Sequence, residues 1–205
     1  MQWTSNLIKI LFASFICLFS LAANADNASS LFRHSGDPVS GNAKGAITVA
    51  EFFDYDCPHC VNMVSTIHAI IAANPNVRFV AKELPVLGPN SVLAARAALA
   101  AKTQGKYNPF SQALFADSRQ IDDATVTGIA KDLGLNVTKF KQDMNSNNVT
   151  EQLKANMALA NQLGVPGTPA FFIGKTSATS MDTIQQLSGE VSQSELQAAI
   201  DKAKG

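Results

Sequence analysis

The chain has 205 residues, a length that suits one domain or one domain carrying an insertion. Its 16 basic and 16 acidic side chains balance, so the composition argues against a nucleic-acid partner or an anionic membrane surface. Hydrophobic residues make up 46% of the chain, which is enough to build the core of a globular domain.

Residues 1–25 have the pattern of a secretory signal peptide. One cation, Lys9, precedes an apolar run over residues 10–21, and the small-residue sequence Ala-Asn-Ala ends at Ala25. An uncleaved membrane anchor is the weaker alternative, because the run is shorter than the about 20 apolar residues that a span needs. We therefore predict cleavage after Ala25 and export to a compartment in which disulfides persist.

The next segment, residues 26–45, is polar and rich in glycine, serine and asparagine, which predicts a loose lead-in. Residues 46–55 (AITVAEFFDY) are β-branched and aromatic, and they predict a buried strand that contains the ionisable residue Glu51. Apolar residues at helical spacing follow Cys57, and residues 77–84 (VRFVAKEL) predict a second strand. A strand, a helix and a strand in this order form a βαβ unit with parallel strands.

Residues 88–163 differ in character, because their pattern is helical almost throughout. Five segments carry it: SVLAARAALAAKTQ, NPFSQALFAD, DDATVTGIAKDLG, NVTKFKQDMN and TEQLKANMALANQLG. We predict that residues 88–163 are a helical insertion that covers one side of the sheet. Residues 46–87 and 164–205 would then form the domain into which it is inserted.

Strand character returns in residues 165–174 (VPGTPAFFIG). Residues 181–189 (MDTIQQLSG) are interpreted as the hairpin partner of this strand, although their apolar positions would also suit a helix. Ser192 and Glu195 have the spacing of a capping box ahead of an amphipathic stretch, which predicts a C-terminal helix.

The motif DYDCPHC holds Cys57 and Cys60, which are the cysteines that remain once the leader is removed. A structural disulfide between them would close almost no loop and would stabilise the fold little. A zinc site needs three or four protein ligands, and beyond the two cysteines only His34, His59 and His68 are available as histidine or cysteine ligands. A C-x-x-C motif at the start of a helix, directly after a strand, favours thiol redox chemistry instead.

The expected helix start gives the two cysteines different properties. Cys57 would lie at the helix N-terminus, where free N–H groups and the positive end of the helix dipole favour a thiolate. Cys60, one turn on, is placed to attack a mixed disulfide formed at Cys57. Pro58 suits the first helical turn, and His59 would stabilise the thiolate further by its charge or by a hydrogen bond.

The sequences EFFDYDCPHC and VPGTPAFFIG resemble the DsbA family of bacterial thiol:disulfide oxidoreductases, and the resemblance extends over about residues 36–204. KELPVLGPNSVLAARAALAA is most similar to the short, ScsC-like branch of that family. The resemblance implies an α/β thioredoxin fold with a helical insertion between the βαβ unit and the C-terminal hairpin and helix. It also implies a periplasmic protein without a cofactor or metal, in which Cys57 is the exposed attacking cysteine and Cys60 the buried resolving one of a redox-active disulfide.

The resemblance also assigns a role to the loop before the third strand. Pro169 matches the family's cis-proline, whereas composition alone would leave it an ordinary proline at a strand entry. A cis bond would set this loop against Cys57 and would expose the backbone of Thr168 for pairing with an extended substrate segment.

Glu51 matches the buried acid that the family places under its active site. Such a carboxyl could take or give a proton as the Cys60 thiol reacts. The alternative is a strand residue whose carboxylate reaches solvent. Lys82 is a candidate neighbour of Glu51.

The function that the resemblance implies is the introduction of disulfides into exported, cysteine-containing client proteins, with reoxidation by a DsbB-like membrane protein. We expect a monomer.

Two acidic residues beside the motif act against this interpretation. Asp54 and Asp56 would oppose a thiolate at Cys57 by their charge, and Asp56 could also cap the helix. Thr168 is typical of the family's isomerases, which leaves a reductase or isomerase as an alternative, although residues 26–45 are too short for an isomerase's dimerising stalk. A copper- or zinc-handling protein is a third hypothesis, suggested only by the ScsC-like resemblance.

Overall fold

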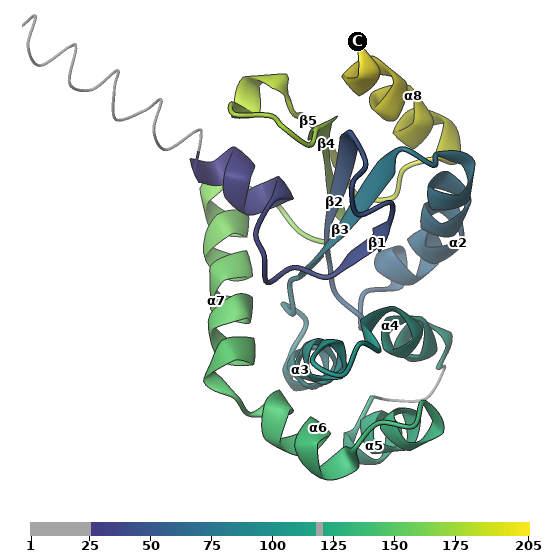
Figure 1. Ribbon diagram of the computed structural model, residues 1–205, viewed down its shortest axis with the longest axis vertical. Helices are drawn as coiled ribbons and strands as arrows, with labels where there is room; N and C mark the ends of the chain where they lie inside the picture. Colours follow the sequence, from purple (N-terminus) through teal and green to yellow (C-terminus); the bar gives the residue numbers. More distant parts are fainter. Residues whose placement is uncertain (1–25, 118–120) are drawn as a thin grey trace, which may run out of the picture.

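The computed structural model describes residues 26–117 and 121–205, so the predicted signal peptide lies outside the described residues. A five-stranded sheet with strand order β1-β3-β2-β4-β5 forms the centre of the molecule (Figure 1). Its strands are β1 (Val39–Gly41), β2 (Ile47–Phe53), β3 (Val77–Glu83), β4 (Ala170–Lys175) and β5 (Gln185–Ser188). β2 and β3 are parallel, and the other neighbouring pairs are antiparallel.

Helix α2 (Pro58–Ala73) connects β2 to β3, so the predicted βαβ unit is confirmed. The predicted hairpin is also confirmed, because β5 pairs with β4 and only Met181–Thr183 forms a short 3₁₀ turn before it. Helix α8 (Gln193–Lys204) closes the chain, and Ser192 and Glu195 make the expected capping box at its start.

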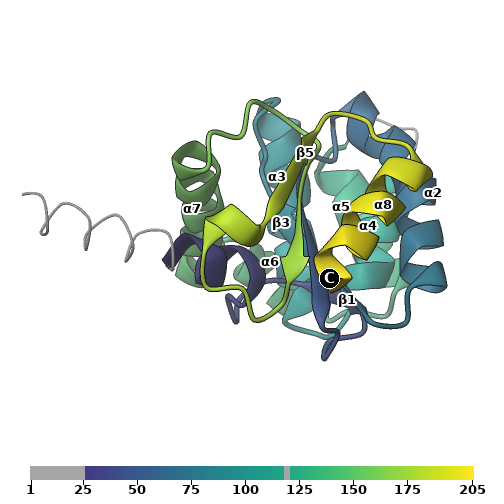
Figure 2. The ribbon, with the colours of Figure 1, turned by 90° about the horizontal axis from the view of Figure 1, so that it is seen from above.

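Helices cover both faces of the sheet, as Figure 2 shows. On one face, the apolar side chains of α2 and α8 pack against Val49 and Phe79 of the central strands. On the other face, α7 (Asn147–Gln162) and the helical residues 26–32 pack against Ala50, Phe52 and Val80. This division follows from the alternation of side chains along a strand, which sends neighbouring residues to opposite faces.

The predicted helical insertion is confirmed as five helices: α3 (Pro89–Lys102), α4 (Tyr107–Ala116), α5 (Asp123–Asp132), α6 (Val137–Met144) and α7. Its placement differs from the expectation of a layer on one side of the sheet. Only α7 runs along a face, whereas α3 to α6 lie beyond the end of β2 and β3 (Figure 1). Their core continues into the sheet through Phe53 and Ala81. The insertion therefore faces the segment that links β2 to α2.

The prediction of a loose lead-in over residues 26–45 is wrong. Residues 26–32 are helical, and Leu31 and Phe32 are fully buried against the sheet. β1 then adds an edge strand to β3. The polar composition of this segment hides these contacts, because a few apolar side chains hold it and their partners are distant in the sequence. Within the described part of the chain, no helix is both long and apolar enough to cross a membrane.

Candidate active site

The segment between β2 and α2 places both cysteines of the C-x-x-C motif at the start of α2. The N–H of Cys57 donates to the carbonyl of Asp54 (3.2 Å), which closes a tight turn after the strand. Cys57 is the N-cap residue of α2, and Pro58 occupies the first helical position, where its missing N–H costs no hydrogen bond. Cys60 follows one turn later on the buried side of the helix. Both cysteines are free thiols.

The expectation that Cys57 is exposed is wrong for the residue as a whole. Its relative exposure is 4%, against 1% for Cys60. The loop before β4 lies against it, and the Cys57 thiol donates a hydrogen bond to the carbonyl oxygen of Thr168 (3.3 Å). The Thr168-Pro169 peptide bond is cis, as the family resemblance implied. Cys57, Thr168 and Pro169 are thus brought together across 111 positions of the sequence.

Burial separates the chemistry of the two thiols. The pKa of Cys60 is raised well above its ordinary value, first by burial and then by the nearby Glu51 carboxyl, so this group strongly prefers the thiol form. Cys57 instead lies at the N-terminal end of α2, where the positive end of the helix dipole is located.

The suggestion that Asp56 caps α2 is wrong, because Asp56 is exposed and the cap residue is Cys57 itself. Asp54 is the acid that organises the turn. One of its carboxylate oxygens accepts the N–H of Asp56 (2.9 Å), and the other accepts the N–H groups of Val86 (2.8 Å) and Leu87 (3.0 Å). Asp54 therefore ties the loop after β3 to the cysteine turn.

His59 lies on the exposed side of the first turn of α2. Its Nδ1 is 2.5 Å from a carboxylate oxygen of Glu190, and Asn62 donates to the same oxygen (2.9 Å). The pKa of Glu190 is lowered, first by the hydrogen bond from His59. The sequence did not indicate this partner, because Glu190 lies in the turn before α8, 131 positions away.

Glu51 is buried in the central strand, with a relative exposure of 4%, so the alternative of a carboxylate that reaches bulk solvent is wrong. Its pKa is raised well above the ordinary value, first by burial and then by the charges of Glu83 and Cys57. It lines a cavity of about 290 Å³ between the sheet, α2 and α4, whose other walls include Ile67, Phe79 and Phe115. Burial and these neighbouring charges therefore favour the protonated form of Glu51, which stands near the cysteine pair and beside this cavity.

The prediction that Lys82 neighbours Glu51 is wrong. Lys82 points to the opposite face of the sheet, where it contacts Asp37 (2.5 Å) and the carbonyl of Ser30 (2.6 Å). Its neighbour Glu83 shares the face of Glu51, because Phe53, two residues from Glu51 on β2, pairs with Glu83 on β3.

Glu83 is the centre of a buried hydrogen-bond network that the sequence pattern did not indicate. Tyr107 donates to its Oε1 atom at 2.6 Å, and Tyr55 donates to the same atom at 2.9 Å. Burial raises the pKa of Glu83 to about 8, although both tyrosine hydrogen bonds act to lower it. The sequence signal that could have indicated Glu83 is the one that indicated Glu51, an acidic residue within a predicted strand.

We expect Glu83 to make the stability of the fold depend on pH. Its pKa of about 8 lies above the ordinary 4.5, so its stabilisation is complete below about pH 4.5 and is lost as the pH rises through about 8. One such group adds a slope of at most about 1.4 kcal/mol per pH unit to the unfolding free energy. Urea unfolding of Glu83→Gln between about pH 5 and pH 8 should show a shallower decline than the wild type. Equal slopes would contradict this assignment.

The described residues contain no group of three or more His, Cys, Asp and Glu side chains that could hold a metal ion.

Comparison with known proteins gives a match to the family described as "DSBA-like thioredoxin domain" over residues 48–201. A thioredoxin-like oxidoreductase from Silicibacter pomeroyi is 42% identical, with a TM-score of 0.78 over 86% of this chain and 96% of that chain. A periplasmic thioredoxin-like protein from Salmonella enterica is 25% identical, with a TM-score of 0.73 over 87% and 97%. The catalytic domain of ScsC from Proteus mirabilis, 24% identical over 90% and 99%, shares the fold with a TM-score of 0.75.

Curated proteins are also similar to this chain. A segment of the Na(+)/H(+) antiporter NhaA of Herminiimonas arsenicoxydans is 30% identical over 67% of this chain, but the chain spans only 22% of the antiporter's length. A protein of Rickettsia typhi that is described as a candidate protein-disulfide oxidoreductase is 28% identical over 74% of this chain and 60% of its own length.

Proposed function

The chain belongs to the DSBA-like thioredoxin domain family, and from this premise we propose that it works as an oxidase that introduces disulfides into exported proteins. It is a DsbA-like protein-disulfide oxidoreductase with a C-x-x-C pair at Cys57 and Cys60. The proposal concerns the direction of electron flow: from client thiols to the enzyme's disulfide.

The observation that carries this direction is the position of Cys57 as the N-cap of α2. The first turn of the helix, which lies wholly among the described residues, contains no acidic side chain that would offset the positive end of the helix dipole. A thiolate at this position is stabilised by the positive end of the helix dipole. Since stabilising the reduced form makes the disulfide a better oxidant, this geometry favours oxidation of clients.

In the proposed cycle, a client thiolate attacks the Cys57 sulfur of the Cys57–Cys60 disulfide. A mixed disulfide forms, and the bonding electrons of the broken S–S bond leave with Cys60 as a thiolate. Glu51 gives this thiolate a proton, and the buried Cys60 then stays a thiol. A second client thiolate attacks the client sulfur, which forms the client disulfide and releases Cys57 as a thiolate. The client loses two electrons, and the enzyme pair gains them.

The client would be held at an apolar surface beside Cys57. Four large apolar side chains of the described residues are exposed: Val61, Val86, Leu87 and Val92. Val61 lies one helical turn from Cys57, and Asp54 fixes the backbone of Val86 and Leu87 next to the cysteine turn. The Thr168 backbone can pair with an extended segment of the client.

We expect Leu87→Ser to raise the KM for a reduced, apolar client peptide by about threefold to tenfold, because Leu87 offers exposed apolar area for the client to cover. Stopped-flow measurement of peptide oxidation provides the test. Reduced glutathione is too small to need this surface and serves as the control, so its rate should not change. An equal effect on glutathione would show damage to the cysteine site instead.

Equilibration of the purified protein with glutathione buffers tests the direction of the reaction. We expect a reduction potential more positive than about −200 mV, on the oxidising side of glutaredoxins. A more negative potential would overturn the oxidase proposal.

A reductase or isomerase is the second candidate, and the observation that favours it is Thr168, which precedes the cis-proline and contacts Cys57. Refolding of a protein with scrambled disulfides separates the two candidates, because an oxidase restores little native protein from it.

For its cellular setting, we propose cleavage of residues 1–25, a periplasmic monomer, and reoxidation by a DsbB-like membrane protein. The likeness to a periplasmic thioredoxin-like protein of Salmonella enterica supports this location.

A further inference from the structure

Glu83 is a carboxyl group whose two oxygen atoms have different surroundings. Oε1 accepts hydrogen bonds from the hydroxyl groups of both Tyr55 and Tyr107. Oε2 is buried and has no hydrogen-bond partner within residues 26–117 and 121–205. A full negative charge on this group would leave one buried oxygen without any donor, which is costly. A neutral, protonated carboxyl costs less to bury than a carboxylate does, so the geometry suits a group that holds a proton.

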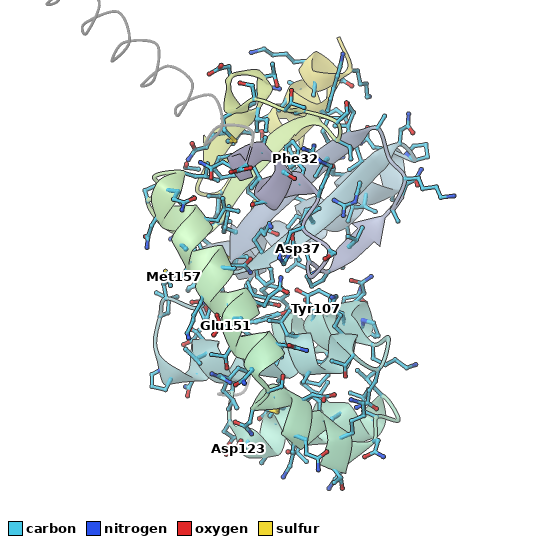
Figure 3. All side chains as sticks on the ribbon, turned by 60° about the vertical axis from the view of Figure 1, so that its left-hand side comes forward. Phe32, Asp37, Tyr107, Asp123, Glu151 and Met157 are labelled. Carbon is cyan, nitrogen blue, oxygen red and sulfur yellow. The ribbon has the colours of Figure 1, made fainter. Side chains whose placement is uncertain are left out.

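Two tyrosines, Tyr55 and Tyr107, connect Glu83 to the surroundings of the redox pair. Tyr55 lies two residues before Cys57 and packs edge-on against Phe53, with ring centroids 5.1 Å apart. Tyr107 begins α4 and lines the same cavity as Glu51. Figure 3 shows Tyr107 where the helical insertion meets the sheet. Glu83 therefore lies between the cysteine turn, the insertion and the proton-exchanging Glu51.

Glu51 and Glu83 occupy the same face of two adjacent parallel strands. Ala81 is the register partner of Glu51, and Glu83 is two residues further along β3. Both side chains are almost fully buried, with exposures of 4% and 1%. Two carboxyl groups so placed resist simultaneous ionisation, because like charges repel strongly where water is excluded.

We propose that Glu83 is a positioning residue for the redox pair: it holds a second proton beside Glu51 and thereby sets how tightly Glu51 keeps the proton that it exchanges with Cys60. This inference rests on the role of Glu51 in the proposed function. It adds to that role a buried acid that touches neither the client nor the cysteines and acts through Glu51.

The proposal predicts a definite order of events. When Cys60 leaves as a thiolate, Glu51 transfers its proton to Cys60 and becomes a carboxylate. A protonated Glu83 lets that charge form, whereas an ionised Glu83 opposes it and keeps the proton on Glu51. Proton transfer to Cys60 should therefore become harder once Glu83 ionises, near pH 8.

The direct test is ¹³C NMR of the reduced protein labelled at the glutamate carboxyl carbons, titrated with pH. Glu83→Gln keeps the shape of the side chain and its ability to accept both tyrosine hydrogen bonds, but it cannot ionise. We expect Glu51 to titrate about one pH unit lower in Glu83→Gln than in the wild type, because its like-charged neighbour is gone. An unchanged Glu51 titration in a folded Glu83→Gln protein would overturn the proposal.

A kinetic measurement adds a readout that a purely structural role would not move. The rate at which glutathione reduces the oxidised pair is measured against pH for the variant and the wild type. The ratio of the two rates removes the ionisation of glutathione itself. We expect the rate of Glu83→Gln divided by that of the wild type to be constant at low pH. As the pH passes 8, this quotient should rise by roughly threefold or more, because the wild-type rate alone is slowed by the opposing charge on Glu83. A flat ratio throughout would also overturn the proposal.

Two further variants serve as controls. Tyr107→Phe removes one donor and keeps the carboxyl, so the titration of Glu83 should move to higher pH; it also carries the test if Glu83→Gln does not fold. A Tyr107→Phe protein in which the Glu83 titration stays in place would count against the proposal.

The variant Glu51→Gln separates this inference from the proposed function. If Glu51→Gln leaves the rate unchanged, the role of Glu51 fails, whereas a slow Glu51→Gln with an unaltered Glu83→Gln refutes only the role of Glu83.

Discussion

Replacing Cys60 with alanine is expected to abolish turnover and to trap the protein as a mixed disulfide through Cys57. Cys60 is the more deeply buried of the two cysteines, 1% exposed against 4% for Cys57, and it lies one helical turn further along α2, so we expect clients to react at Cys57. In Cys60→Ala, the Cys57 thiolate attacks an oxidised client, forms the mixed disulfide and releases one client thiolate. The enzyme then has no internal thiol to resolve the complex.

Non-reducing gels and mass spectrometry of Cys60→Ala mixed with an oxidised client peptide will reveal the covalent complex. The matched control is Cys57→Ala, which retains the buried Cys60 and should form almost no complex. A complex of equal yield in Cys57→Ala would mean that Cys60 is the accessible thiol. That outcome would reverse the roles assigned to the two cysteines.

The second large effect concerns stability, because Lys82 and Asp37 form an ion pair whose side chains are 1% and 0% exposed. Gln152 of α7 donates to the other Asp37 oxygen (2.8 Å), and Lys82 also donates to the carbonyl of Ser30. The pair therefore joins the N-terminal segment, β3 and α7, and Figure 3 shows Asp37 in this region. Burial raises the pKa of Asp37 and lowers that of Lys82, so each charge depends on its partner.

Lys82→Met should lower the unfolding free energy by about 3–5 kcal/mol, because it leaves the Asp37 carboxylate buried without its cation. That loss is a large share of the about 5–15 kcal/mol that stabilises a typical domain. Urea unfolding at neutral pH measures it. The double variant Asp37→Asn/Lys82→Met removes both charges and should regain part of the loss. A Lys82→Met protein as stable as the wild type would show that the pair contributes no stability.

The sequence alone supported much of the fold because the relevant signals are local. Helical spacing in residues 88–163, the capping box at Ser192 and the apolar strand around Glu51 each depend on residues a few positions apart. The redox function could also be predicted from local sequence, because two cysteines at this spacing at the start of a helix are typical of thiol redox sites. The cis bond at Pro169 agrees with what the family resemblance implied, and local sequence alone did not indicate it.

What only the tertiary structure decided is which distant side chains share a face or a turn. Whether Lys82 or Glu83 neighbours Glu51 depends on the register of β3 against β2, and a shift of one residue would exchange their faces. The burial of Cys57 depends on a loop 111 positions away, and the network of Glu83 requires Tyr55 and Tyr107 to meet at one atom. Local composition sets how each segment folds, but long-range packing sets the surroundings of each carboxyl and thiol. Those surroundings determine which of these groups keeps its proton.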